Sequence, residues 1–264
     1  MLCEGESEEI ILPRLFEEAD LPVDPSFVSV VPLGGRHVNH FWRLLNALSI
    51  PHVTLLDLDR ERETGGWGRV KYVLDQLLTL GRSKTELLVY TVKGRGPAVL
   101  SDKELKSMAT WDDGNKPVMG LWLRLLQSQD VFFSVPLDID FAMLRSFPDA
   151  YRSAKTGVGP RNSNQTKNFA KYEERIKNAC RAVLKCESAT ADSYTEEEKD
   201  AFIWYHHLFL GRGKPSTHIL ALNEIRAGEL WEKAPAQLKL LVKRVREILS
   251  SHVESAVDET LSPA

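Results

Sequence analysis

The chain has 264 residues, of which 43% are hydrophobic and 27% are charged, and its net charge is -3. A globular protein of this length buries a substantial core, in one large domain or two smaller ones. No apolar run is long enough to span a bilayer and no charged leader precedes an apolar stretch, so we expect neither a membrane segment nor a secretory signal. The three cysteines form no CxxC pair, which argues against a zinc ribbon or a disulfide framework and favours a reducing, cytoplasmic location.

Acidic and basic residues are unevenly distributed along the chain. The stretch from Glu4 to Asp20 holds seven acidic residues and one basic residue, whereas the stretch from Tyr151 to Lys185 holds nine basic residues and two acidic ones. An acidic centre beside a basic segment is what a metal-dependent enzyme acting on a polyanion needs. A basic helix face that is simply solvated would give the same pattern, so charge alone leaves both interpretations open.

The amino terminus is predicted to be a very short strand followed by a helix. If Leu2 and Cys3 end a strand, Glu4 lies at the carboxyl end of that strand, and Gly5 marks a tight turn before the helix. Glu8 follows one helical turn later and could face the same site. A strand that begins at the first residue is unusually short, and we therefore expect the chain to be a piece of a longer protein.

Two strand–helix units follow. The pattern predicts a strand from Ser26 to Leu33 and a helix from His37 to Leu48, then a buried strand from Val53 to Leu56 and a helix from Val70 to Leu80. Strands and helices that alternate through short connections indicate right-handed crossovers and a parallel sheet. Ligands bind outside the carboxyl ends of such strands, which is where Asp57 stands.

Asp57 and Asp59 form a DxD pair at the end of this buried strand. On an extended backbone, side chains two residues apart point the same way, so both carboxylates would be aimed at one spot. Two converging anions repel each other unless a cation or a proton lies between them. Two plainer interpretations remain, namely a solvated pair in a loop, or Asp57 as the cap of a following helix.

The middle of the chain carries a second acidic pair. After a possible strand from Leu87 to Val92 and a helix from Leu121 to Leu126, a strand from Asp130 to Pro136 runs directly into Asp138 and Asp140. Asp138 is interpreted either as a plain helix N-cap or, with Asp140, as part of a site shared with the first pair. Residues 1–150 are predicted to form one catalytic α/β domain.

Residues 151–264 are predicted to be a smaller helical domain with a basic segment. It opens with a linker or mobile loop from Arg152 to Thr166. Helices are predicted at residues 167–185, 195–210, 215–227 and 235–249.

Two features of this helical part bear on function. A glycine-rich turn carries Arg212 and Lys214 before a helix whose first residue is predicted to be Pro215, and basic side chains beside a helix amino terminus attract phosphate. The turn lacks Walker A spacing, and by itself it favours a plain helix connection over a site. The seven histidines show no metal-ligand spacing, since a helix would point the adjacent His206 and His207 apart, and we interpret them as partly buried polar residues.

Three segments, EGESEEIILPRL, SVVPLGG and LLDLD, resemble the Toprim domain, and in particular its version in the OLD (overcoming lysogenization defect) family of nucleases; the later GKP is similar to the lysine-bearing element of that family. The resemblance implies a Toprim-type, mostly parallel sheet flanked by helices, followed by a smaller all-helical domain, in a bacterial or phage-related protein. OLD proteins carry an ABC-type ATPase domain ahead of Toprim. This chain contains no Walker A, signature or Walker B motif, so it looks like the carboxyl-terminal catalytic region alone. Leu58 departs from the small residue usual between the two aspartates.

The resemblance also implies a set of carboxylate metal ligands: Glu4, Glu8, Asp57, Asp59 and a later acid, Asp138 or Asp140. Glu4 and Asp57 are expected to be catalytic, and Lys214 to stabilise the charge that grows on the phosphate. Carboxylate oxygens without thiolate or imidazole ligands select Mg²⁺ or Mn²⁺. This many carboxylates at one sheet edge would hold two ions about 4 Å apart, as two-metal phosphodiester cleavage requires.

DNA is the expected polyanion, cut as in an endonuclease. Six basic residues are expected to hold its backbone without reading bases: Arg152, Lys155, Arg161, Lys167, Lys171 and Arg212. In the full-length protein the resemblance implies the ATPase domain as a partner, and that protein could be a homodimer.

Three other functions fit parts of the pattern. A non-catalytic Toprim module, as in recombination mediators, would bind nucleic acid or partner proteins and leave the acids structural. A topoisomerase needs a nucleophilic tyrosine, and the sequence does not single one out. A phosphohydrolase would make Asp57 the nucleophile and leave Glu4 unexplained. Glu8, the second acidic pair and Lys214 together favour catalysis, because a pure binder has no need of a dense anionic centre facing DNA.

Overall fold

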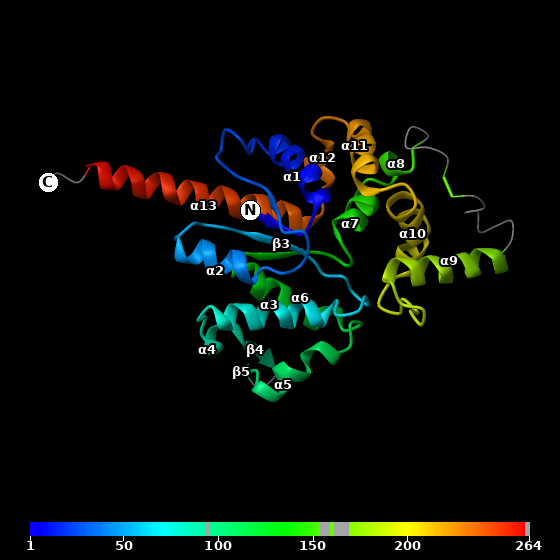
Figure 1. The fold of residues 1–264 in the computed structure, drawn as a ribbon, viewed down its shortest axis with the longest axis horizontal. Helices are drawn as coiled ribbons and strands as arrows, with labels where there is room; N and C mark the ends of the chain where they lie inside the picture. Colours follow the sequence, from blue (N-terminus) through cyan, green and yellow to red (C-terminus); the bar gives the residue numbers. More distant parts are fainter. Residues whose placement is uncertain (93–95, 154–158, 161–168, 262–264) are drawn as a thin grey trace.

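The computed structural model describes residues 1–92, 96–153, 159–160 and 169–261. Its centre is a sheet of four parallel strands with helices on both faces, and a helical region follows (Figure 1). The predicted fold class, a mostly parallel α/β sheet followed by an all-helical part, is confirmed.

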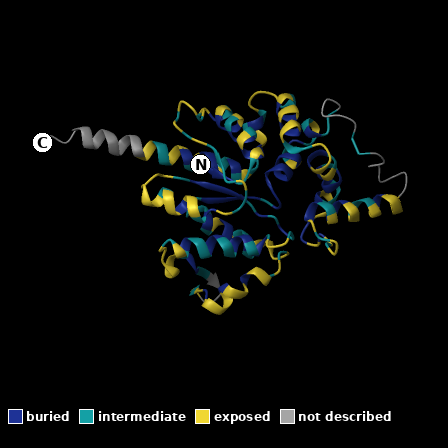
Figure 2. Cartoon of the chain, viewed as in Figure 1, coloured by how far each residue is buried: buried dark blue, intermediate teal, exposed yellow. Residues whose placement is uncertain are grey.

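The strands are short and lie in the order β2–β1–β3–β6. Their bounds are β1 (Leu2–Cys3), β2 (Val31–Pro32), β3 (Thr54–Asp57) and β6 (Val131–Ser134). Successive side chains of a strand point to opposite faces of the sheet. In β3, Leu55 accordingly packs in one hydrophobic cluster and Leu56 packs in another. A parallel sheet with helices on both faces is buried on both, which is why its strands are apolar runs (Figure 2).

The helices of the first part divide between the two faces of the sheet. They are α1 (Glu6–Glu18), α2 (Asn39–Ala47), α3 (Trp67–Thr79), α4 (Lys84–Leu87), α5 (Asp102–Ser107), the 3-10 helix η1 (Met108–Thr110) and α6 (Lys116–Gln127). Ile11 of α1 packs in the cluster of Leu55, whereas Trp42 of α2, Val70 of α3 and Trp122 of α6 pack in the cluster of Leu56. The helices that follow β1 and β3 therefore cover opposite faces.

This arrangement creates a topological switch point at the carboxyl ends of β1 and β3. The two strands are neighbours in the sheet, but the chain leaves them toward opposite faces. Ligands of open α/β sheets bind outside the strand ends at such a switch point, because the connections on the two sides diverge. Glu4 follows β1 and Asp57 ends β3, so both stand at this switch point.

Two predicted strands differ from the structure. The predicted strand from Ser26 to Leu33 was too long: the N–H of Val28 bonds to the carbonyl of Val23 at 2.9 Å and Phe27 has a φ of 55°, so a turn occupies its first half. The predicted strand near residues 87–92 is β4 (Val89–Val92), which pairs antiparallel with β5 (Gly96–Val99) in a separate ribbon, not with the main sheet.

The helical region packs against the cluster that contains Leu55. Its elements are α7 (Ile139–Ser146), α8 (Pro148–Tyr151), α9 (Phe169–Leu184), α10 (Glu196–Tyr205), the π-helical turn η3 (His206–Leu210), α11 (Lys214–Glu224), α12 (Glu229–Lys233) and α13 (Ala236–Leu261). Val183 of α9 and Leu241 of α13 share that cluster. Helix α13 runs beyond the predicted end at residue 249. None of the helices in the described ranges has the length and apolarity needed to cross a membrane.

Candidate active site

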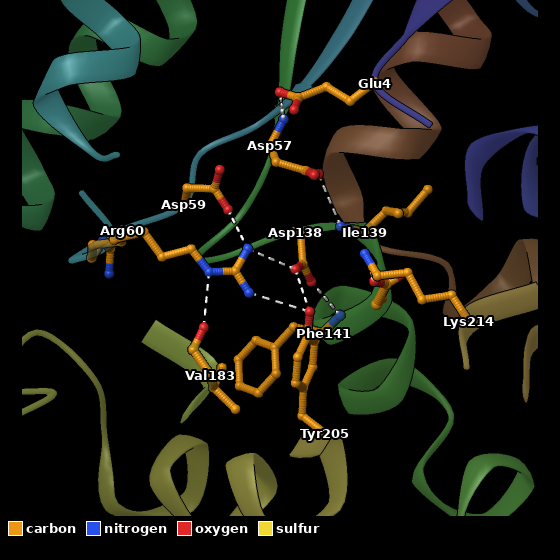
Figure 3. A network of polar contacts seen from close by, with 12 residues as sticks. Glu4, Asp57, Asp59, Arg60, Asp138, Ile139, Phe141, Val183, Tyr205 and Lys214 are labelled. Atoms are coloured by element: carbon orange, nitrogen blue, oxygen red, sulfur yellow. Dashed lines mark hydrogen bonds and ion pairs between the residues drawn. The ribbon is translucent and has the colours of Figure 1, made fainter. Parts of the chain in front are cut away.

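Three acids from separate elements lie near one another at the carboxyl ends of β1 and β3. The backbone N–H of Asp57 donates to Oε1 of Glu4 at 3.0 Å, which ties the ends of the two strands together (Figure 3). Glu8 lies in the first turn of α1 and is 2% exposed. Its Oε2 accepts the N–H of Gly5 at 3.2 Å, whereas its buried Oε1 has no hydrogen-bond partner among the described residues. The fold thus places Glu4, Glu8 and Asp57 at one rim.

The pKa values of these three acids are raised. Burial is the largest cause in each case. The pKa of Glu8 rises to about 8, and the carboxylates of Asp140 and Glu4 add to the effect of burial. The pKa of Asp57 rises well above its usual value because Glu4 and Glu8 add like charges to a desolvated site. In the described part of the chain no lysine or arginine pairs with Glu8 or Asp57, whereas Glu4 pairs with Arg69 at 3.0 Å.

Asp59 does not extend the strand. Its φ is 53°, a left-handed conformation, so the expectation that Asp57 and Asp59 point the same way on an extended backbone was wrong. The carboxylate of Asp59 instead bonds to Arg62 at 2.6 Å and to Arg69. Burial opposes ionisation of Asp59, but the two guanidinium groups hold its pKa below the usual value. Arg69 also contacts Glu4 and so joins Asp59 to the rim.

Arg62 connects the sheet with the helical region. Its guanidinium bonds to Asp59 and lies 3.2 Å from Asp138, and it donates to the carbonyl of Val183 at 2.9 Å and to the hydroxyl of Tyr205 at 3.3 Å. The carboxylates labelled Asp59 and Asp138 in Figure 3 thus have a cation between them.

Asp138 caps α7, as one of its two interpretations predicted. Its Oδ1 accepts the N–H of Phe141 at 2.9 Å, and its Oδ2 accepts the hydroxyl of Tyr205 at 2.6 Å. The next residue, Ile139, donates its N–H to Oδ1 of Asp57 at 3.2 Å. The amino terminus of α7 therefore faces the rim, and Asp138 lies behind it with its oxygens engaged.

Asp140 belongs to a buried chain of polar groups that ends at Lys214. Its Oδ2 lies 2.6 Å from Nζ of Lys214, and its Oδ1 lies 2.8 Å from Nε2 of His218. Nδ1 of His218 lies 2.6 Å from the hydroxyl of Tyr151. Burial opposes the charge on Asp140, but His218 and Lys214 lower its pKa. Burial likewise opposes the charge on Lys214, and Asp140 and Asp138 outweigh it and raise the pKa of this lysine. The Lys214 side chain stays 44% exposed, so it is anchored yet accessible.

Sequence reasoning missed the partners of the acids: Arg62, Arg69, Tyr151, Tyr205 and His218. One signal was present for His218, which follows Lys214 by four residues and so shares its helix face. Arg62 and Arg69 lie just after the DxD pair, but only the fold shows which acids they reach. The histidine was interpreted as a partly buried polar residue, and it is fully buried.

Three of the predicted nucleic-acid residues are described, Arg152, Lys171 and Arg212, and they belong to the helical region. Arg152 stacks over the ring of Trp204, 5.3 Å from its centroid. Lys171 is exposed on α9, and Arg212 is exposed in the turn before α11. Three further predicted residues lie outside the described ones: Lys155, Arg161 and Lys167.

The donor set at the rim fits a divalent cation of the Mg²⁺ or Mn²⁺ kind. No three carboxylate, imidazole or thiolate side chains of the described residues are already drawn together as metal ligands. However, among the described residues only three lysine or arginine side chains contact the six predicted acids, namely Arg62, Arg69 and Lys214. The uncompensated charge falls on Glu4, Glu8 and Asp57, where Glu8 also has an unpaired oxygen. Hard oxygen donors with excess negative charge suit these ions.

Comparison with known proteins finds a family model that matches the first part of the chain. Residues 1–59 match the family described as Overcoming lysogenization defect protein-like, TOPRIM domain, and the predicted resemblance is confirmed there. Among solved structures, the C-terminal region of the Burkholderia pseudomallei OLD protein is 18% identical, with 94% of this chain and 96% of that chain covered and a TM-score of 0.43. That of the Xanthomonas campestris pv. campestris OLD protein is 18% identical, with 96% of each chain covered and a TM-score of 0.47. No curated protein matches the chain.

Proposed function

We propose that this chain, whose residues 1–59 match the OLD-like TOPRIM family, is the catalytic region of a DNA nuclease that cleaves the phosphodiester backbone with Mg²⁺ or Mn²⁺. The observation that carries the proposal is that Glu4, Glu8 and Asp57 lie near one another at the carboxyl ends of β1 and β3, with more carboxylates than cations among the described residues. Buried acids crowded in this way must hold protons, as their raised pKa values indicate, unless a cation binds between them.

Glu4, Glu8 and Asp57 would hold the cation through their carboxylate oxygens. When bound, a divalent ion supplies Lewis-acid polarisation of the phosphodiester and of water. A second ion, at Asp59 with Asp138 or Asp140, remains part of the proposal, but it requires Arg62 and Arg69 to release Asp59. Asp140 has both oxygens engaged by Lys214 and His218, so we propose that it serves the lysine and that Asp138 is the nearer candidate ligand.

Lys214 would stabilise the negative charge that develops on the phosphate oxygens during cleavage. Three features suit it to this role. Its ammonium is held by the buried Asp140, its raised pKa keeps it charged at neutral pH, and it stands in the first turn of the eleven-residue helix α11, whose dipole favours an anion. Because His218 and Tyr151 fix Asp140 from behind, the lysine is pre-positioned before DNA arrives.

One observation favours a second candidate, a Toprim module that binds nucleic acid without cutting. Arg69 already pairs with both Glu4 and Asp59, which gives these acids a structural role in the absence of a metal. In that case the excess charge on Glu8 and Asp57 would have no catalytic use, and metal would neither bind there nor be needed.

A matched pair of variants tests the proposal. Glu8 and Glu9 are adjacent on α1, but Glu8 is buried at the rim and Glu9 is exposed. We expect Glu8→Gln to lower Mn²⁺-dependent nicking of supercoiled plasmid at least ~100-fold and to weaken Mn²⁺ binding in calorimetry, whereas Glu9→Gln cuts and binds like the parent. EDTA should stop the cutting. Equal cutting by the two variants, or no Mn²⁺ binding by the parent, would favour the non-catalytic module.

A further inference from the structure

A concave site lies in the helical region, separate from the carboxylate rim that Glu4, Glu8 and Asp57 form. It is a cavity of about 740 Å³ between α9 and the π-helical turn, with the Gly211–Arg212 turn at its border. A cavity of this size is in the range that holds a small ligand or part of a larger one. Figure 1 shows α9 and α10 on the far side of α7 from the sheet.

The charged side chains that line the cavity are basic. Its polar lining consists of Arg175, Asn178, His206, His207 and Arg212, and the described lining includes no acidic residue. Nη1 of Arg175 is buried from solvent and has no hydrogen-bond partner among the described residues. A guanidinium N–H that is buried without an acceptor costs free energy, which an anionic oxygen in the cavity would recover.

The π-helical turn explains how two adjacent histidines reach one cavity. A regular helix would point His206 and His207 apart, as the sequence predicted, but both line the cavity. The turn from His206 to Leu210 widens the helix, and the N–H of Gly211 bonds back to the carbonyl of His206 at 3.0 Å. Single-turn π-helical segments of this kind are frequently found at functional sites.

We propose that this cavity binds a backbone phosphate of a DNA strand. The proposal rests on the proposed function in that DNA is taken as the substrate. Arg175 and Arg212 would bind the phosphate oxygens, and the apolar lining residue Ile203 would contact the sugar. Arg212 precedes Lys214 by two residues in the same turn, so a strand held in the cavity would be guided toward the lysine at the rim. Contacts of this kind are independent of base sequence.

Binding without cleavage tests this site. The probe is a 5′-phosphorylated, 3′-labelled deoxythymidine decamer, titrated by fluorescence anisotropy in EDTA so that no cutting occurs. We expect Arg175→Ala and Arg212→Ala each to weaken decamer binding about tenfold and to lower the slope of log Kd against log salt by about one. Arg181→Ala is the matched control, because Arg181 is exposed on the same helix α9 but does not line this cavity.

A free nucleotide could supply the same phosphate chemistry, and thymidine 5′-monophosphate distinguishes the two sources. The proposal requires the decamer to bind more tightly than the monophosphate. The proposal would be overturned if the monophosphate bound more tightly than the decamer. It would also be overturned if both arginine variants bound the decamer as tightly as Arg181→Ala does. Circular dichroism checks folding, and if Arg175→Ala unfolds, the exposed Arg212 decides alone. The decamer titration is done without metal and measures binding alone. Its outcome can therefore be interpreted even if the test with Glu8→Gln rejects the nuclease proposal.

Discussion

The six predicted acids fall into two groups. Asp59, Asp138 and Asp140 form a balanced group, because each contacts a cation, namely Arg62, Arg69 or Lys214. Glu4, Glu8 and Asp57 form an unbalanced group: of these three, Glu4 alone contacts a lysine or arginine among the described residues, and that arginine, Arg69, is also bound to Asp59. The pKa values of Asp59 and Asp140 are lowered, whereas those of Glu4, Glu8 and Asp57 are raised. The same side-chain chemistry at one sheet edge therefore has two electrostatic states.

The difference shows that an acidic pattern does not by itself mark metal ligands. A carboxylate whose charge is already balanced stabilises the fold, and one whose charge is not balanced is available for an external cation. Asp138 lies between the two, since it contacts Arg62 and caps α7, yet burial and the neighbouring Asp140 raise its pKa.

Removing the cation from the balanced group should have the largest effect. Arg62→Ala leaves Asp138 without a guanidinium, leaves Asp59 with Arg69 alone, and breaks the bond to the carbonyl of Val183. We expect the free energy of unfolding in urea to fall by about 3–5 kcal/mol. Arg43→Ala, at an exposed arginine on α2, should change it by less than about 0.5 kcal/mol. If Arg62→Ala lowered the free energy of unfolding by less than about 1 kcal/mol, the idea that Arg62 balances the charges of Asp59 and Asp138 would be contradicted.

Removing the lysine should affect cleavage more than folding. Lys214→Ala should slow plasmid cleavage roughly 10²–10³-fold, because an electrostatic donor to the transition state is lost. Mn²⁺ binding at Glu4, Glu8 and Asp57 should be retained in calorimetry. Lys243→Ala, at an exposed lysine on α13, is the control and should cut like the parent. Loss of Mn²⁺ binding in Lys214→Ala would contradict the division of the acids, because it would show that metal binding at Glu4, Glu8 and Asp57 depends on the lysine paired with Asp140.

The unbalanced group should make the metal-free protein less stable as pH rises. Folding raises the pKa of Glu8 from 4.5 to about 8, so between these values the folded protein holds a proton that the unfolded chain has released. The contribution is complete below pH 4.5 and is lost as pH approaches 8, at about 1 kcal/mol per pH unit. Urea unfolding in EDTA at several pH values measures this slope.

Glu8→Gln should flatten that slope, and Glu9→Gln should not. Glu4 and Asp57 shift in the same direction, so part of the slope should remain in Glu8→Gln. Mn²⁺ should stabilise the parent more at pH 8 than at pH 5.5, because its ligands must be deprotonated. Stability that increases between pH 5.5 and 8 in EDTA would refute the grouping.

The smallest effect is expected at the far end of the buried chain behind Lys214. Tyr151→Phe removes one hydrogen bond, to Nδ1 of His218, and keeps the ring. We expect a loss of about 1 kcal/mol in stability and less than about tenfold in cleavage. An effect as large as that of Lys214→Ala would show that Tyr151 acts on the substrate and not through Asp140.

The strand ends could be predicted from the sequence, but the orientation of their side chains could not. Apolar runs followed by acids located the ends of β1, β3 and β6, since a parallel sheet is buried on both faces. The left-handed φ of Asp59 could not be foreseen, because a DxD sequence gives no sign of where the strand stops. The partners Arg62 and His218 could not be assigned either, since their contacts depend on the tertiary packing of the helical region against the sheet.

Arg62 joins the rim to the end of α9, and this has a thermodynamic consequence. The same guanidinium that binds Asp59 also holds the carbonyl of Val183, one residue before α9 ends. A ligand that draws Asp59 away from Arg62 removes one of the groups that hold this guanidinium at the helix end, and we expect it to weaken the hold on α9. By reciprocity, any partner that shifts α9 changes the affinity of the rim for that ligand by the same factor.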